Sequence, residues 1–144
     1  MGRDGNRDTA ARRMTLQARV IGDDALRVVE DGFELDVDLN WYRSLPLSSV
    51  ATLELTVDDE TVPSNEIVFA VNGKEYSLDE LANRWEEYWF VLDAATLRVR
   101  RSLVRAGGPV DVHVRLGTRI PYLPIGPTQA VIYVSECSRI LTPI

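Results

Sequence analysis

Apolar and polar side chains alternate over residues 33–40, which is the clearest periodic segment of the chain. The apolar set is Phe33, Leu35, Val37 and Leu39, and the polar set is Glu34, Asp36, Asp38 and Asn40. Because successive side chains of a strand point to opposite faces, the alternation predicts a strand with one buried face and one face in water.

Similar patterns recur along the chain and predict an all-β fold. Apolar segments that fit strands cover residues 16–21, 26–30, 50–57, 67–71, 75–77, 88–92, 96–101, 111–116 and 130–134. We expect residues 118–123 to continue the strand at 111–116, before Pro121, Pro124, Gly126 and Pro127 end regular structure. Short strands at such spacing are typical of an antiparallel β-sandwich, here of about nine strands.

Two local motifs predict a hairpin turn and the start of a single helix. Asn72-Gly73 is a strong hairpin signal, since a type I′ turn needs positive φ at both central residues. Ser77 and Glu80 match a capping box, in which a hydroxyl caps the helix start and a carboxylate reaches back to the cap residue. We therefore expect one short helix that ends near Glu87.

Composition and charge narrow the class of protein. Residues 1–13 hold almost no apolar side chains and are predicted to be a flexible arm, which leaves residues 14–144 as a single domain. The net charge of −6 argues against nucleic acid as a partner. An apolar run of about 18 residues, the length of a membrane span, does not occur. With one cysteine, Cys137, and no export signal, the cytoplasm is the simplest compartment.

A search for catalytic or metal-binding groups finds isolated residues. The single histidine, His113, is predicted to face outward on a strand, with Asp111 on the same face as the one group that could orient it. Cys137 has no neighbouring group that would activate its thiol. The acidic residues 58–60 could bind calcium, but a solvated hairpin tip is the simpler interpretation. We therefore predict no catalytic residue, metal or cofactor in this chain.

Aromatic clusters carry more information than the titratable groups. One cluster comprises Trp41, Tyr42 and Arg43, followed by Leu45, Pro46 and Leu47. Trp85, Tyr88 and Trp89 form a second cluster, and Tyr122 lies close to Arg119 in a third. The clusters could serve in core packing, in a protein interface or in a ligand site, and the sequence leaves all three roles open. Trp, Tyr and Arg are enriched at interfaces, and aromatic rings also stack on sugars.

Taken in order, several short sequences resemble those of a known family. They are G-F-E-L-D-V at residues 32–37, W-Y-R-S-L-P-L at 41–47, L-E-L-T-V-D at 53–58, F-A-V-N-G-K-E-Y-S-L-D-E-L at 69–81, the aromatic residues at 85–89, and R-I-P-Y-L-P at 119–124. Their order and spacing resemble the small (beta) subunit of bacterial C-glycoside deglycosidases.

The resemblance implies a β-sandwich bound to a large (alpha) subunit, a sugar-isomerase-like TIM-type barrel that carries a divalent metal, Mn or Mg. It implies that the heteromeric complex cleaves the carbon–carbon bond of 3-oxo-C-glycosides by β-elimination, with the catalytic groups on the barrel. The first cluster, Arg119 and Tyr122 are then expected to bind the partner. Trp85, Tyr88 and Trp89 would contact substrate or partner, unless they form the stacking platform of a stand-alone carbohydrate-binding module.

Overall fold

The structure, a computed structural model, describes residues 20–126 and 129–144, and the side chains of residues 121–130 are outside the described part. Its described strands are β1 (Leu26–Val29), β2 (Gly32–Val37), β3 (Leu45–Pro46), β4 (Val50–Val57), β5 (Glu60–Thr61), β6 (Ile67–Val71), β7 (Lys74–Ser77), β8 (Tyr88–Trp89), β9 (Ala95–Val99), β10 (Val110–Gly126) and β11 (Gln129–Leu141). Three short 3-10 helices are η1 (Leu47–Ser49), η2 (Ser64–Glu66) and η3 (Leu78–Asn83). The predicted all-β fold is thus confirmed, with eleven described strands instead of about nine.

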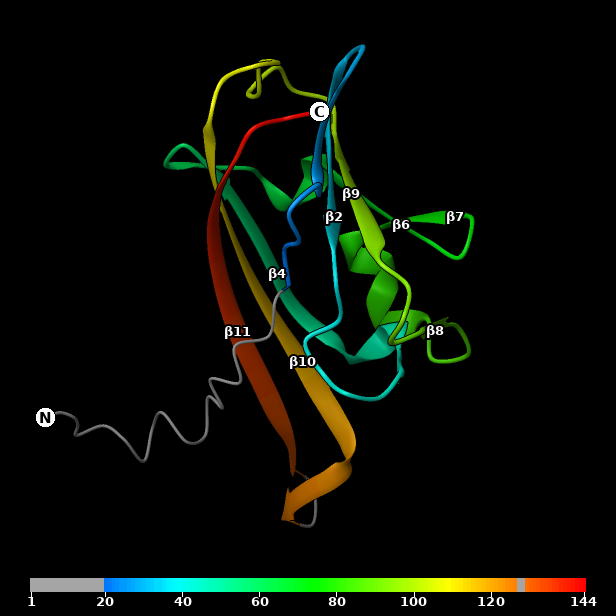
Figure 1. Cartoon of the computed structure of the whole chain (residues 1–144). Coiled ribbons are helices and arrows are strands. Elements are labelled where there is room, and N and C mark those ends of the chain that lie inside the picture. The colour runs from blue at the N-terminus through cyan, green and yellow to red at the C-terminus, as the bar shows by residue number, and fades with distance from the viewer. Residues whose placement is uncertain (1–19, 127–128) are drawn as a thin grey trace, which may run out of the picture.

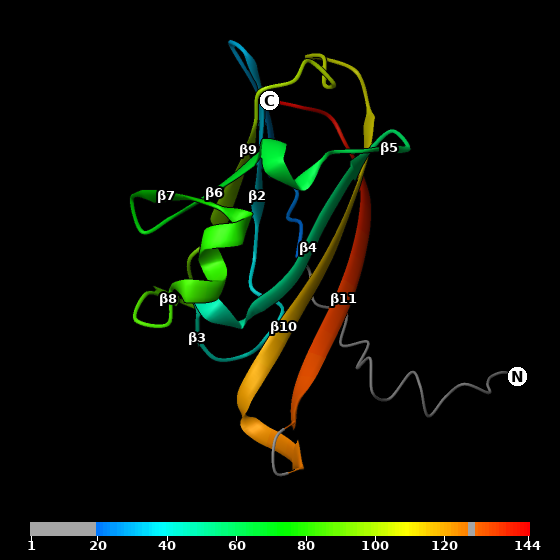
Figure 2. The same cartoon turned by 180° about the vertical axis from the view of Figure 1, so that it is seen from behind.

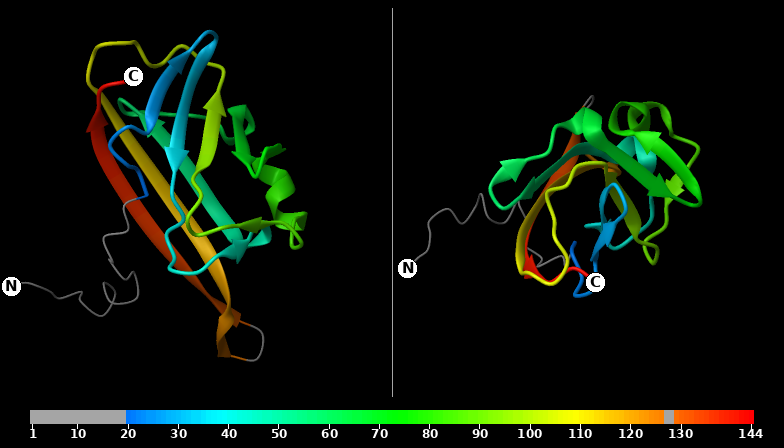
Figure 3. Two further views of the ribbon diagram at one scale, coloured as in Figure 1. Left: turned by 45° about the vertical axis from the view of Figure 1, so that its right-hand side comes forward. Right: turned by 90° about the horizontal axis from the view of Figure 1, so that it is seen from above.

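The strands form two main antiparallel sheets that enclose the core between them (Figures 1 and 3). One sheet has the order β1-β2-β9-β6-β7 and the other has the order β11-β10-β4-β5. A separate two-stranded ladder joins β3 to β8. Figure 2 shows that ladder beside η3, on the flank where β4 begins.

The predicted alternation matches the core wherever a strand is regular. Phe33, Leu35 and Val37 of β2 are buried, and so are alternate residues of β10 from Val112 to Leu116. The prediction for Asn40 was wrong, because the sequence analysis assigned it to the face in water, whereas it is 3% exposed in the structure. The strand ends at Val37, so the two-residue period no longer determines which way Asn40 points.

Both local motifs form as predicted, although the helix is shorter. Asn72 and Gly73 have φ values of 56° and 76°, as a type I′ turn requires. Ser77 accepts from the Glu80 backbone N–H, and the Glu80 carboxylate accepts from the Ser77 N–H. The capped element is the 3-10 helix η3, and it ends at Asn83 instead of near Glu87.

The largest difference from the sequence prediction is the length of β10 and β11. Pro121 and Pro124 do not end β10, which continues to Gly126 opposite Gln129 of β11. Pairing of β10 with β4 stops at Thr118, so beyond that point the prolines need not donate a hydrogen bond on that side. The two strands therefore extend together beyond the rest of the sandwich (Figure 3).

Two predictions concern the start of the chain. The flexible arm at residues 1–13 lies outside the described residues, as does most of the strand predicted at 16–21. Val20 and Ile21, which are described, are buried but lie in no strand. No helix in the described part of the chain is long and apolar enough to cross a membrane.

Candidate partner-binding surface

The first aromatic cluster passes from the core to the surface within three residues. Trp41 is partly buried, with its ring centroid 5.3 Å from that of Tyr133 on β11. Tyr42 packs beside Trp41 at 5.0 Å but is 67% exposed. The guanidinium of Arg43 lies over the Tyr42 ring, 5.5 Å from its centroid. The partly buried Trp41 thus supports an aromatic side chain and a cation that are presented to solvent.

The second cluster lies directly beside the segment that follows the first. Leu45 pairs with Trp89, and Pro46 pairs with Tyr88, in the β3–β8 ladder. The contact extends in both directions, because Ser44 Oγ accepts from the Val91 N–H at 2.8 Å. Two segments that lie about forty residues apart in the sequence therefore form one region of the surface.

The β6–β7 turn holds this second segment in place. The Asn72 side-chain amide donates to Glu87 Oε2 at 2.8 Å and to the Tyr88 carbonyl at 2.7 Å. Lys74 Nζ lies 3.0 Å from Glu87 Oε1. Hydrogen bonds from Asn72 and then Lys74 lower the pKa of the Glu87 carboxyl below its ordinary value. The backbone that carries these exposed aromatic residues is therefore tied down on both sides.

The two segments carry six of the nine large apolar side chains that are exposed in the described part of the chain. We call this set the apolar platform: Tyr42, Trp85, Tyr88, Phe90, Val91 and Leu92. Tyr88 and Phe90 stack with their ring planes 28° apart, and Leu92 is 93% exposed. The sequence analysis assigned residues 88–92 to a strand and did not single out Val91 or Leu92, because an unbroken run of five apolar residues does not indicate which side chains face water.

Three predicted contact residues belong to the core instead. Leu45, Leu47 and Trp89 are 1%, 0% and 0% exposed. Trp89 packs edge-on against Phe69 with ring centroids 5.3 Å apart, and its indole N–H donates to the Asp93 carbonyl at 2.9 Å. Pairing in the β3–β8 ladder turns Leu45 and Trp89 inward, so they support the platform without being available to a partner.

The other predicted contact residues differ in placement. Pro46 is partly exposed on β3, beside Tyr88. Arg119 is exposed on β10, in the four-stranded sheet and not beside the β3–β8 ladder. Tyr122 lies in β10, but its side chain is outside the described part of the structure. A partner role for the exposed residues stays a prediction.

The titratable residues singled out in the sequence occupy the four-stranded sheet. His113 contacts Ser138 through Nδ1, and its Nε2 lies 3.2 Å from Glu136 Oε1. The sequence analysis named Asp111 as the one group that could orient the imidazole, whereas the contacts of His113 are with Ser138 and Glu136. The Asp111 backbone N–H donates to Asp58 Oδ1. Among the described residues, no group of three or more His, Cys, Asp or Glu side chains is arranged to hold a metal ion.

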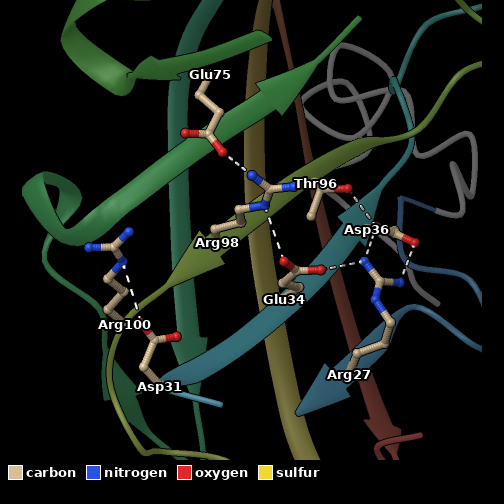
Figure 4. Close-up of polar contacts among 8 residues, drawn as sticks. All are labelled: Arg27, Asp31, Glu34, Asp36, Glu75, Thr96, Arg98 and Arg100. Atoms are coloured by element: carbon tan, nitrogen blue, oxygen red, sulfur yellow. Dashed lines mark hydrogen bonds and ion pairs between the residues drawn. The ribbon is translucent and has the colours of Figure 1, made fainter. Parts of the chain in front are cut away.

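The outer face of the five-stranded sheet has the opposite character to the platform. Its ion pairs and hydrogen bonds, drawn in Figure 4, join Arg27, Glu34, Asp36, Glu75, Thr96 and Arg98. The hydrogen bond from Arg27 lowers the pKa of the Asp36 carboxyl, with Thr96 adding to the effect. Burial raises the pKa of the nearby Asp38 carboxyl. This face satisfies its own charges and suits contact with water.

Comparison with known proteins identifies the family. The family model described as C-glycoside deglycosidase beta subunit matches residues 16–122. The chain is 41% identical to a 3'-dehydrocarminate deglycosidase beta subunit of Microbacterium sp., over 76% of this chain and 83% of that protein. It is 36% identical to a C-glycoside deglycosidase beta subunit of Arthrobacter globiformis, over 82% and 90% of the two chains. The chain therefore belongs to the C-glycoside deglycosidase beta subunit family.

Proposed function

We propose that this chain is the non-catalytic beta subunit of a heteromeric C-glycoside deglycosidase. It would bind a large, sugar-isomerase-like TIM-barrel subunit in the cytoplasm, and the barrel would carry the catalytic groups. The observation that carries the proposal is the apolar platform, an exposed aromatic surface on a chain that belongs to a family named as beta subunits.

The platform has the properties of a protein interface. Exposed apolar side chains gathered in one region of a surface, instead of scattered singly, mark sites of association. Binding costs less when the contact residues are already ordered, and here Asn72, Ser44 and the β3–β8 ladder hold the backbone. Tyr42 and Trp85, each 67% exposed, are of the residue types that most often dominate binding energy.

The chemistry of the proposed substrate explains why the catalytic groups would reside elsewhere. A C-glycosidic bond has no leaving oxygen for a general acid to protonate. In a 3-oxo-C-glycoside the C3 ketone acidifies the C2 proton, so a base on the large subunit can remove it. As the enolate returns to the ketone, a double bond forms between C1 and C2 and the bond from C1 to the aglycone carbon breaks. The aglycone carbon leaves with the bonding electron pair and takes up a proton. A divalent metal, Mn or Mg, would stabilise the enolate oxygen from the large subunit.

Co-expression with a sugar-isomerase-like barrel subunit tests the proposal. We expect the two chains to co-purify, and Tyr42→Ala and Trp85→Ala each to weaken their association by about 2 kcal/mol, roughly thirtyfold in Kd. Arg43→Ala should also weaken it, whereas Arg100→Ala provides a matched control. Arg100 is highly exposed beside Asp31 (Figure 4), and it belongs to neither of the two segments that carry the platform. If the chain purified as a monomer with no affinity for the barrel, the proposal would be rejected. If Arg43→Ala and Arg100→Ala changed the Kd equally, the platform would be rejected as the interface.

The competing function, a stand-alone carbohydrate-binding module, has less support. Its stacking platform was predicted to be Trp85, Tyr88 and Trp89, and Trp89 is fully buried. The remaining pair can be tested by following tryptophan fluorescence while the isolated chain is titrated with a C-glycoside. Saturable quenching in the absence of the large subunit would favour this function, and a flat titration is the result we expect.

A further inference from the structure

A buried polar cluster lies directly beneath the first segment of the apolar platform. Asn40 is 3% exposed and Thr118 of β10 is fully buried, within a core that is otherwise almost entirely apolar. The Thr118 hydroxyl donates to Asn40 Oδ1 at 2.9 Å. The Asn40 amide nitrogen lies 3.0 Å from the Leu116 carbonyl, 3.3 Å from the Tyr133 carbonyl and 3.2 Å from Ser135 Oγ.

These contacts join one residue of a loop to two strands of the opposite sheet. Leu116 and Thr118 belong to β10, while Tyr133 and Ser135 belong to β11. An apolar side chain at position 40 could fill the same space, but its packing would be compatible with several conformations of the loop. A buried amide is satisfied only where all its partners are in reach, so a network of this kind selects one geometry.

The geometry that Asn40 selects is that of the residues that follow it. Trp41 packs on Tyr133, the residue whose carbonyl lies near Asn40. Tyr42 packs on Trp41, and Arg43 lies over Tyr42. The path from the fully buried amide to the exposed ring and cation is therefore a continuous series of contacts, in which each residue rests on the one before.

We propose that Asn40, through Thr118 and the β10–β11 backbone, is the positioning residue that sets Tyr42 and Arg43 in the orientation that binds the large subunit. This inference rests on the proposed function. Asn40 does not itself touch the partner. It acts by limiting the loop to one arrangement before binding, which removes an ordering cost from association.

The variant that tests this removes both side chains of the Asn40–Thr118 pair, so that neither is left buried without the other. Asn40→Leu combined with Thr118→Val replaces both side chains of the pair by apolar groups of similar size, an exchange that can leave stability nearly unchanged. We expect this double variant to fold with a similar Tm and to bind the large subunit about tenfold more weakly, which corresponds to roughly 1.4 kcal/mol.

A double-mutant cycle separates positioning from general loss of structure. In a Tyr42→Ala, Arg43→Ala background, the Asn40→Leu, Thr118→Val pair should change the Kd by less than about twofold, because the groups it positions are gone. An equal loss in both backgrounds would overturn the proposal.

Backbone order parameters from NMR relaxation of the isolated chain give a readout that does not need the partner. In the double variant the order parameters of residues 41–43 should fall from about 0.85, the value of rigid backbone, to below about 0.6, with β2 and β9 unchanged, since only the loop is released. Unchanged order parameters at residues 41–43 would overturn the positioning role, even if the variant bound the large subunit more weakly. Lower order parameters in a chain whose wild type does not bind the barrel would instead reject the proposed function and, with it, the positioning of Tyr42 and Arg43 for a partner.

Discussion

Trp85 and Trp89 offer a direct test of the surface and core assignments, because they are the same residue type four positions apart. Trp89 is fully buried against Phe69, whereas Trp85 is 67% exposed. Burying a tryptophan removes roughly 150–250 Å² from water, which at about 25 cal/mol per Å² is worth about 4–6 kcal/mol. Substitution by alanine in cores costs about 3–5 kcal/mol. We expect Trp89→Ala to lower the free energy of unfolding by about 4 kcal/mol, and Trp85→Ala to lower it by at most about 0.5 kcal/mol.

The assay is urea unfolding of each variant, followed by far-UV circular dichroism, with the Kd for the large subunit measured in parallel. Trp89→Phe serves as a milder control for Trp89→Ala, because it keeps an aromatic ring at this position. It retains an aromatic contact with Phe69, loses the hydrogen bond to the Asp93 carbonyl and should cost about 1–2 kcal/mol. Similar unfolding free energies for Trp85→Ala and Trp89→Ala would refute the assignment. So would a weaker subunit interaction caused by Trp89→Phe but not by Trp85→Ala.

Three further substitutions test the backbone and the electrostatics. A Cβ on Gly32 would clash with the Val99 carbonyl oxygen, so Gly32→Ala should push β2 from β9 and lower the urea midpoint by an amount equivalent to about 1–3 kcal/mol. Gly73 has a φ of +76°, and Gly73→Ala should cost about 1–2 kcal/mol in the same assay, unlike Gly108→Ala in an open loop with negative φ. Because Arg27 lowers the pKa of Asp36, this carboxylate stabilises the fold above the unfolded-state pKa of about 3.9, and the contribution is lost as the pH falls through the lower folded-state value. Asp36→Asn should therefore flatten the stability profile below about pH 4, and an unchanged acid limb would contradict the assignment.

Periodicity predicted the parts of the fold in which a long strand has one buried face. Such a strand buries one residue in two, so β2 and β10 could be read from local sequence alone. Leu45 and Trp89 could not, because their burial depends on pairing between segments more than forty residues apart. Pro121 was interpreted by its usual effect on strands, which does not apply where one side of β10 has no strand beside it.

The candidate site was only partly predictable for the same reason. Aromatic content indicated the two segments, but it could not separate the exposed Trp85 from the buried Trp89. Asn40 carried no signal of its own, because it ended an alternating pattern that continues three residues beyond β2. The acceptors that make its burial possible lie at Leu116 and Tyr133. Residues that act through distant backbone groups become visible only once the chain is folded.

The contrast between the charged face of the five-stranded sheet and the apolar platform supports binding to a specific partner over nonspecific association. A net charge of −6 and the ion pairs around Arg98 favour contact of the five-stranded sheet with water. If exposed apolar surface were merely tolerated, we would expect it to be scattered singly. Instead six of the nine exposed large apolar residues in the described part of the chain are gathered on two adjoining segments. Their backbone is held by Asn72, by Ser44 and, beneath the first of them, by Asn40. Such ordering does little for a surface that only meets solvent, and it lowers the entropy lost when a partner of fixed shape is bound. The ordered platform is therefore better explained by a stable subunit contact than by transient association.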